Sequence, residues 1–277
     1  MRKILSKFYN FCSSWTGTVI IVLFIIFFIA QAFVIPSGSM KNTLLVGDYL
    51  FVKKFSYGIP TPHIPFVEIP VLPDSDGDGH LIAGDGPKRG DIVVFRYPKD
   101  PKIHYVKRNF ATGNDEVIFA PSAMYLRPSG GDDEINSKFK DADIVILGGK
   151  RFIKEPYKMA GIHYDNNTNK DNYGGLEADT FTIAGMVDFA MSEVMIPELP
   201  KISGLSFNAY YFKVPQDEYF MVGDNRENSS DSRFWGSVPY KYIVGTPWFV
   251  YLSYDENYKI RWDRIGRLTS SLEEMAK

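Results

Sequence analysis

Apolar and polar residues alternate in short stretches over most of the chain after residue 47, with the period of two that is typical of β-strands. Glycine, proline, asparagine and aspartate separate these stretches and indicate turns. A helical period is clearest near the C-terminus, where apolar residues recur at Ile265, Leu268, Leu272 and Met275. The pattern predicts strands at 48–55, 91–97, 103–110, 116–120, 143–148, 180–186, 208–214, 218–223 and 243–254. We therefore expect a mainly β fold built from antiparallel sheets.

The N-terminal segment has a different pattern, because no residue from position 8 to position 40 carries a charge. Residues 15–35 are long and apolar enough for a helix that crosses a bilayer, which needs about 20 such residues. Arg2, Lys3 and Lys7 precede this segment, so the positive-inside rule places the N-terminus in the cytoplasm. We expect one transmembrane helix, with the rest of the chain exported.

A cleavable signal peptide is the alternative for this segment. Its start would also be basic, and Ala30-Gln31-Ala32 is similar to a cleavage site with small residues at two positions. The same three residues raise the hypothesis that the protein cuts its own chain there. Under both interpretations the rest of the chain, after this segment, is exported across the membrane.

The composition is that of a globular protein, with 45% hydrophobic and 23% charged residues. The net charge of -2 gives no reason to expect nucleic acid as a partner. Cys12 is the one cysteine in the sequence, which excludes an intramolecular disulfide and a zinc site built from cysteines. The four histidines are scattered, which argues against a histidine metal site.

The first segment with candidate chemistry is IPSGSM, residues 35–40, at the end of the apolar run. At most ~14 Å of extended chain separates Ser39 from the end of the expected span, so Ser39 lies near the outer membrane surface. No G-x-S-x-G turn surrounds it, and S-x-x-K fails because Met40 stands three residues after Ser37. A nucleophilic serine here needs another base, and lysine is the usual substitute. A polar end to a membrane helix is the alternative.

The predicted strand 103–110 offers such a lysine. Period-two alternation puts Lys107 on one face with Ile103 and Tyr105, while Arg108 points to the other face. A lysine on an apolar face is desolvated, which lowers its pKa from about 10.4 and favours the neutral amine. A neutral amine can take the proton of a serine hydroxyl. The alternative is a lysine at a strand end that reaches water.

The third segment is GDNRENSSDSRFWG, residues 223–236, which follows the apolar strand EYFMV. It combines acidic and basic residues with three serines between two glycines. We interpret it as a buried, ion-paired and hydrogen-bonded support beneath an active site. An exposed polar turn is the alternative.

Together these segments resemble those of type I signal peptidases (leader peptidases), the membrane-anchored serine endopeptidases that remove signal peptides. The serine motif of that family is similar to residues 35–45, and a second motif is similar to residues 47–50. The lysine motif resembles residues 88–108, and the last motif resembles residues 223–236. The motifs occur in the order of the family, although the ~100 residues between the last two carry none that we can match.

The resemblance implies roles for individual residues. Ser39 corresponds to the nucleophile and Lys107 to the general base. The hydroxyl of Ser37 and the backbone N–H of Ser39 correspond to the oxyanion hole. Ser229 corresponds to the serine that orients the lysine amine. Such a site requires neither metal nor cofactor.

The resemblance also implies supporting ion pairs. Asp231 and Arg233 correspond to one pair, and Arg108 is expected to pair with Asp224. This chain departs from the family at Asn42, where proline is usual, and the departure affects the turn that follows the nucleophile.

The resemblance further implies a location and partners. We expect a single-pass protein of the bacterial cytoplasmic (inner) membrane, with the catalytic domain on its outer, periplasmic side. Its partners would be signal peptides of exported preproteins, membrane lipid and the secretion translocon. Two alternatives remain open: a membrane-anchored binding or scaffold protein, and a specialised peptidase that matures one pilus or conjugation protein.

The expected organisation has six parts, with a Pro/Gly/Asp-rich excursion from the sheet at 58–90 and a large inserted subdomain. They are a cytoplasmic N-terminus (1–14), a transmembrane anchor (15–35), a first part of the catalytic core (36–110), an inserted β-rich subdomain (111–205), a second part of the core (206–255) and a partly helical C-terminal segment (256–277).

One side signal lies in the excursion, where the spacing of Asp74, Asp76, Asp78 and Asp85 resembles that of a calcium-binding loop. The flanking residues are poor helix formers, which argues against a helix–loop–helix calcium site. We expect a turn-rich excursion without a metal, and calcium binding remains the alternative.

Overall fold

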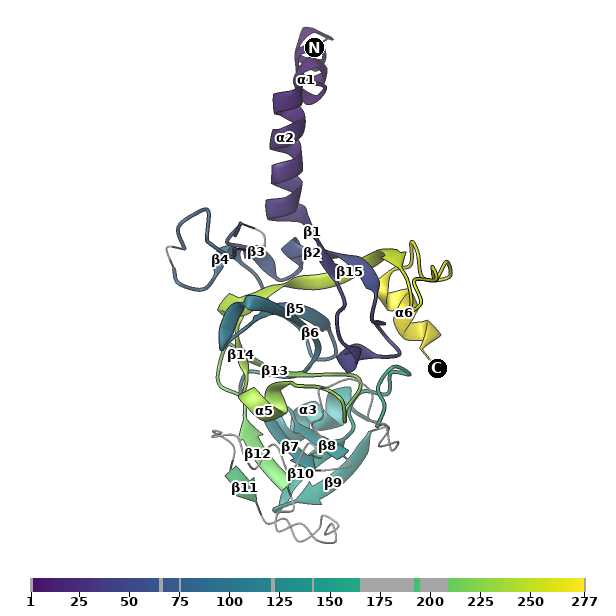
Figure 1. The fold of residues 1–277 in the computed structure, drawn as a ribbon. Coiled ribbons are helices and arrows are strands. Elements are labelled where there is room, and N and C mark those ends of the chain that lie inside the picture. Colours follow the sequence, from purple (N-terminus) through teal and green to yellow (C-terminus); the bar gives the residue numbers. More distant parts are fainter. Residues whose placement is uncertain are drawn as a thin grey trace.

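The computed structural model describes residues 2–64, 67–74, 76–120, 123–140, 142–164, 192–194 and 209–276 (Figure 1). The strand expected at 180–186 lies outside these residues. The described chain forms a helical stalk at the N-terminus and a body made mainly of antiparallel sheets (Figure 1). The mainly β expectation is therefore confirmed.

Two helices form the stalk, α1 (Arg2–Cys12) and α2 (Trp15–Phe24), and α2 continues into a π-helical turn, η1 (Ile25–Ile29). The stalk projects away from the body (Figure 1). The next residues form strand β1 (Ala30–Val34). The expectation of one helix over 15–35 is therefore wrong for its last part, where the chain is a strand.

β1 is a strand because its backbone finds a partner on the body. Its residues pair antiparallel with β2 (Asp48–Lys53), from Ala30 opposite Lys53 to Val34 opposite Tyr49. A short apolar run has the same composition in a buried helix and in a strand, so periodicity could not separate the two. Among the residues that the structure describes, no helix is both long enough and apolar enough to cross a membrane.

The first sheet has seven strands in the order β1-β2-β15-β5-β6-β13-β14, and every pair is antiparallel. β15 lies between β2 and β5, and β13 lies beside β6, so segments from both halves of the chain are neighbours in this sheet. Besides β1 and β2 they are β5 (Ile92–Tyr97), β6 (Asp100–Thr112), β13 (Glu218–Val222), β14 (Val238–Pro239) and β15 (Ile243–Ser253).

This sheet is covered on both faces. Val93 and Val94 are neighbours on β5, and each is fully buried in a different apolar cluster. The cluster around Val94 includes Leu50 of β2 and Leu272 of the C-terminal helix. Consecutive strand residues point to opposite faces, so Lys107 and Arg108 of the neighbouring strand β6, which lie opposite Val93 and Ile92, are both removed from water.

The second sheet has six strands in the order β11-β12-β7-β8-β10-β9. β12 pairs with β7, although it lies within the 206–255 range that we assigned to the second part of the core. The second sheet thus extends beyond residue 205. Its elements are β7 (Glu116–Ala120), β8 (Ala123–Arg127), α3 (Gly131–Lys138), β9 (Asp143–Leu147), β10 (Lys150–Lys154), β11 (Ser192–Val194) and β12 (Ala209–Lys213).

The remaining elements are short. Leu272 of the C-terminal helix is fully buried, but this helix is shorter than the periodicity indicates, since Ile265 and Leu268 precede it. A two-stranded ribbon belongs to the 58–90 excursion. These elements are β3 (Gly58–Pro60), β4 (His80–Ala83), the 3-10 turns η2 (Gly38–Met40), η3 (Lys54–Ser56) and η4 (Tyr240–Tyr242), and the helices α5 (Ser232–Trp235) and α6 (Thr269–Met275).

Candidate active site

Ser39 lies in the 3-10 turn η2, directly after the edge strand β1. The turn is held against residue 225, whose backbone N–H donates to the Ser39 carbonyl at 3.1 Å. The Asn225 side chain also donates to the Gly38 carbonyl at 3.2 Å. Ser39 is only 4% exposed. The serine therefore sits in a fixed, largely dry turn rather than in a mobile loop.

Lys107 reaches Ser39 from β6, and its Nζ lies 2.5 Å from the Ser39 Oγ. Burial lowers the pKa of Lys107 to about 8, while the carboxylates of Asp231 and Asp224 partly oppose this shift. A substantial fraction of this amine is therefore neutral near physiological pH. A neutral amine in contact with a hydroxyl is arranged to accept its proton.

Aromatic rings contribute to this desolvation. The centre of the Tyr105 ring lies 5.2 Å from the Lys107 Nζ. Tyr105 stacks on Tyr97 with ring centres 4.9 Å apart, and Trp235 lies 6.3 Å from Tyr105. Tyr105 and Lys107 thus lie on the same side of β6, as the alternation predicts.

Ser37 lies beside the nucleophile candidate. Its Oγ is 3.5 Å from the Ser39 Oγ, and its side chain is half-buried. A hydroxyl at this distance can turn toward an oxygen that develops negative charge next to Ser39.

Asp231 and Arg233 form a buried pair behind the lysine. The Arg233 Nε donates to one Asp231 oxygen at 2.8 Å and its Nη2 to the other at 2.9 Å. Burial alone would raise the pKa of Asp231, but the Arg233 guanidinium outweighs it and holds that pKa below its usual range. The Gly223 N–H also donates to Asp231 at 3.0 Å. A permanent negative charge therefore lies near Lys107.

Arg108 and Asp224 form a second buried pair, on the opposite side of β6. Both contacts from the Arg108 Nε and Nη2 to the Asp224 carboxylate are 2.7 Å long. The Thr43 hydroxyl donates to the same carboxylate at 2.6 Å. Glu273 of α6 lies 2.7 Å from the Arg108 Nη1. The pair thus ties the turn after Ser39 to β6 and to the C-terminal helix.

Ser229 is buried and lies near Ser39. A Cβ atom at Gly223 would lie 2.3 Å from the Ser229 Oγ and 2.6 Å from the Ser39 carbonyl oxygen. Within the described part of the chain, the Ser229 hydroxyl forms no hydrogen bond to Lys107. The structure thus brings Ser229 beside the nucleophile turn, with Gly223 leaving the space for both.

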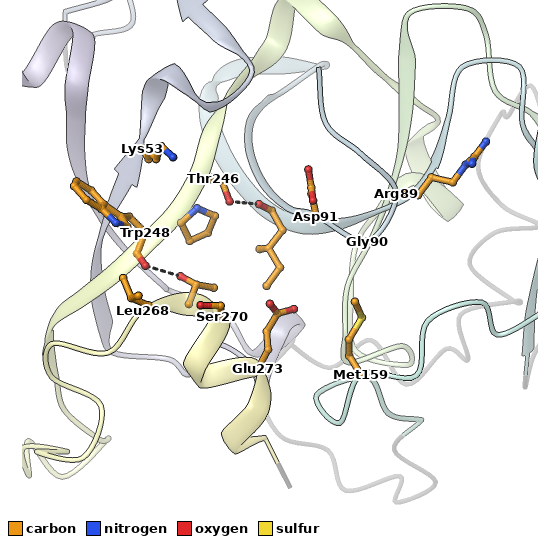
Figure 2. A pocket seen from close by; sticks show the side chains of 13 residues that line it. Lys53, Arg89, Gly90, Asp91, Met159, Thr246, Trp248, Leu268, Ser270 and Glu273 are labelled. Carbon is orange, nitrogen blue, oxygen red and sulfur yellow. Dashed lines mark hydrogen bonds between the residues drawn. The ribbon is translucent and has the colours of Figure 1, made fainter. Parts of the chain in front are cut away.

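A groove of about 470 Å³ is lined in part by Glu273, which pairs with Arg108 (Figure 2). Neither Ser39 nor Lys107 lines it, so it is separate from the serine–lysine contact. Two residues of its lining are joined by the Thr246 hydroxyl, which donates to the Ile92 carbonyl at 2.8 Å (Figure 2). The lining residues are Lys53, Arg89, Gly90, Asp91, Ile92, Met159, Thr246, Pro247, Trp248, Leu268, Thr269, Ser270 and Glu273.

The aspartates of the excursion do not converge on a metal site. Asp74 accepts hydrogen bonds from the N–H groups of Gly77 and Gly79 at 3.0 and 2.9 Å. Asp78 accepts from the His80 N–H at 2.8 Å. Across the described ranges, no group of three or more His, Cys, Asp or Glu residues is placed to hold a metal ion. These carboxylates stabilise turns of their own segment.

Several residues of the site were not singled out from sequence. Thr43 and Asn225 lie inside the serine motif and the last motif, so their neighbours were a signal that could have found them. Glu273 carries no such signal, because only the packing of α6 brings it to Arg108.

A buried serine hydroxyl in contact with a desolvated amine, with a second hydroxyl beside it, is an arrangement that can support acyl transfer. Residues 9–252 match the family model described as "Signal peptidase, peptidase S26". The chain belongs to this family and is therefore a peptidase, a hydrolase. The resemblance drawn from the motifs is thereby confirmed.

Similar proteins from several bacteria match nearly the whole length of the chain. The chain is 49% identical over 295 residues to Signal peptidase I of Helicobacter pylori strain J99, covering 99% of this chain and 98% of the relative. The protein of a second Helicobacter pylori strain is 48% identical over the same shares. Signal peptidase I of Buchnera aphidicola subsp. Acyrthosiphon pisum is 32% identical over 87% of this chain and 76% of the relative.

Proposed function

We propose that this chain removes N-terminal signal peptides from exported preproteins, with Ser39 as nucleophile and Lys107 as general base. The observation that carries the proposal is the 2.5 Å contact between the buried Lys107 amine and the Ser39 hydroxyl. The family membership and the Signal peptidase I relatives support the substrate class.

The reaction follows from the geometry. The Ser39 Oγ attacks the scissile carbonyl carbon while the neutral Lys107 amine takes the hydroxyl proton. The Ser37 hydroxyl and the Ser39 N–H stabilise the oxyanion that forms. Protonated Lys107 then gives its proton to the departing amine, which leaves an acyl-enzyme. A water molecule that loses its proton to Lys107 hydrolyses the ester and restores Ser39.

The two buried ion pairs keep the reacting groups in place. The pair Asp231–Arg233 lies behind the lysine, and Arg108–Asp224 holds the turn after the nucleophile through Thr43. Such pairs hold the backbone around the reacting groups rigid. This matters for catalysis because a displacement of a reacting atom by about 1 Å can lower the rate by ~100-fold. We assign Ser229 to this frame, next to Gly223.

We further propose that the enzyme acts at the outer face of the bacterial cytoplasmic membrane, held there by the stalk. Apolar side chains of α2, including Val19, Ile20 and Phe24, are exposed on the protein and fit a lipid environment. β1 follows the stalk directly (Figure 1), and the turn that holds Ser39 is the next element of the chain. Membrane lipid and the secretion translocon are then its natural partners.

Exposed aromatic side chains on the body support this placement. Tyr258 and Trp262 are 82% and 74% exposed, and Trp248 is 39% exposed. They belong to β15 and the chain that follows it, which lies on the side of the body nearest the stalk (Figure 1). Tyrosine and tryptophan favour the interface between lipid and water.

The experiment that tests the proposal is cleavage of a purified preprotein in detergent by wild type, Ser39→Ala and Lys107→Met. We expect wild type to cut after a small residue and both variants to lose activity. Lys102→Met is the matched control, because Lys102 is an exposed lysine on the same strand. Activity in Lys107→Met would refute the base assignment. A wild type that cuts no preprotein would favour an anchored binding protein instead.

A further inference from the structure

Residues 157–164, which follow strand β10 of the second sheet, lie against the segment that holds the nucleophile. The His163 N–H donates to the Asp224 carbonyl at 2.9 Å, and the Arg226 N–H donates to the His163 carbonyl at 3.0 Å. Asn225, between these two residues, donates to the Ser39 carbonyl. Three segments distant in sequence are therefore hydrogen-bonded side by side, with Asn225 in the middle.

His163 also reaches the turn after Ser39 directly. Its Nδ1 lies 3.1 Å from the Asn42 side-chain nitrogen and 2.8 Å from the Gly161 carbonyl oxygen. The Nδ1 accepts a hydrogen bond from the Asn42 amide in the tautomer that carries its proton on Nε2, and in that tautomer it forms no hydrogen bond to the Gly161 carbonyl. Asn42 has a φ of 77°, in the left-handed region that asparagine tolerates better than most residues. Proline, which is usual here in the family, cannot adopt that angle.

The two segments are packed as closely as a glycine allows. A Cβ atom at Gly161 would lie 2.0 Å from the Thr43 Oγ1, and Thr43 is fully buried. The same Thr43 hydroxyl is hydrogen-bonded to Asp224. The segment that carries His163 therefore has little freedom to move without displacing the residues that follow Ser39.

We propose that His163 is a positioning residue for the cleavage reaction, fixing the nucleophile turn through the Asn42 amide and so aligning Ser39 with Lys107. This inference rests on the proposed function of the dyad. Its physical basis is the short Ser39–Lys107 contact, which a shift of the turn by a fraction of an ångström would lengthen. The inserted subdomain (111–205) then supplies a residue that holds the active-site turn in place.

The test compares three replacements of His163. In His163→Asn the side-chain amide occupies the place of the imidazole Nδ1, whereas in His163→Gln it reaches the place of Nε2. We expect His163→Ala and His163→Gln to lower kcat by about 10- to 100-fold with KM nearly unchanged. His163→Asn should retain most of the wild-type kcat. Lys158→Ala, an exposed position of the same segment, is the control.

A second variant tests the contact from its other side and does not depend on the folding of the first. Asn42→Gly keeps the left-handed backbone and deletes the amide. It should lower kcat as His163→Gln does, and the double variant should be no slower than either alone. Wild-type kcat in folded His163→Gln, or fully additive losses, would overturn the inference. If wild type cuts nothing or Ser39→Ala still cuts, the proposed function itself fails instead.

Discussion

The Lys107 amine lies 2.5 Å from the Ser39 hydroxyl although the two residues are 68 positions apart. Three strands separate β1 from β6 in the sheet, so the turn after β1 carries Ser39 across to β6, where the Asn225 N–H holds it. β13 pairs with the end of β6, with Val222 opposite Arg108, and delivers the segment from Gly223 onward. The serine, the lysine and their polar support therefore meet through backbone pairing rather than through flexible loops.

The first prediction concerns the pH dependence of cleavage. Burial lowers the pKa of Lys107 to about 8, so the amine is mainly protonated, and inactive as a base, below that pH. The rate should therefore rise with pH through this region and level off above it. Single-turnover cleavage by wild type across the range checks this, with folding followed in parallel. A rate that is flat or falls with pH would contradict it.

The second prediction separates the positive charge of Lys107 from its ability to accept a proton. A guanidinium keeps its proton at any pH at which the protein is folded, so Lys107→Arg preserves the charge and removes the base. We expect loss of cleavage at every pH tested. Lys102→Arg, on the exposed part of β6, should cleave as wild type does. Retained activity in Lys107→Arg would mean that positive charge, and not proton transfer, is the contribution of this position.

The sequence alone predicted the residues with local signals. Ser39 stood out through its motif, and Lys107 through the period of two that put it on an apolar strand face. Residues 30–34 were misjudged because an apolar run does not reveal whether its backbone will find a partner strand. Pairing with β2 decides it, and that is a long-range contact.

Other parts of the site had no local signal at all. Glu273 meets Arg108 only because Leu272, one position earlier on α6, is buried in the core of the sheet. His163 reaches Asn42 only because the second sheet delivers residues 157–164 to the nucleophile turn. A single sequence holds no periodicity that pairs such distant positions. Tertiary packing brings these residues into the site, so they are recognised from the structure and not from the sequence.

The third prediction concerns the buried pair Arg108–Asp224. Asp224→Asn leaves the buried guanidinium with Glu273 as its remaining anionic partner, which should lower the free energy of unfolding by at most about 3–5 kcal/mol. Asp132→Asn is the matched control, because Asp132 is 49% exposed in its ion pair with Arg127 and should cost no more than about 1 kcal/mol. Urea denaturation of both variants measures the difference. Equal stability of the two would show that burial of the pair contributes nothing.

The fourth prediction concerns the oxyanion. Ser37→Ala removes a hydroxyl 3.5 Å from the nucleophile oxygen, and a donor of this kind contributes about 100- to 1,000-fold to kcat. KM should change little, because the negative charge on this oxygen is absent from the bound substrate and develops as the tetrahedral intermediate forms. Ser37→Thr keeps the hydroxyl and should recover most of the rate. Steady-state kinetics separate kcat from KM, and a wild-type kcat in Ser37→Ala would remove Ser37 from this role.

The fifth prediction concerns the close packing of residues 157–164, in the inserted subdomain, against the nucleophile turn. The methyl group added by Gly161→Ala overlaps the Thr43 hydroxyl, so either residues 157–164 or the turn must move. Overpacking of this kind typically costs about 1–3 kcal/mol. We expect lower unfolding stability together with slower cleavage, because Thr43 would lose its hydrogen bond to Asp224. Ala160→Ser, at the exposed neighbouring position, should change neither quantity, and a Gly161→Ala enzyme that matches wild type in both would show that the two segments are not tightly packed.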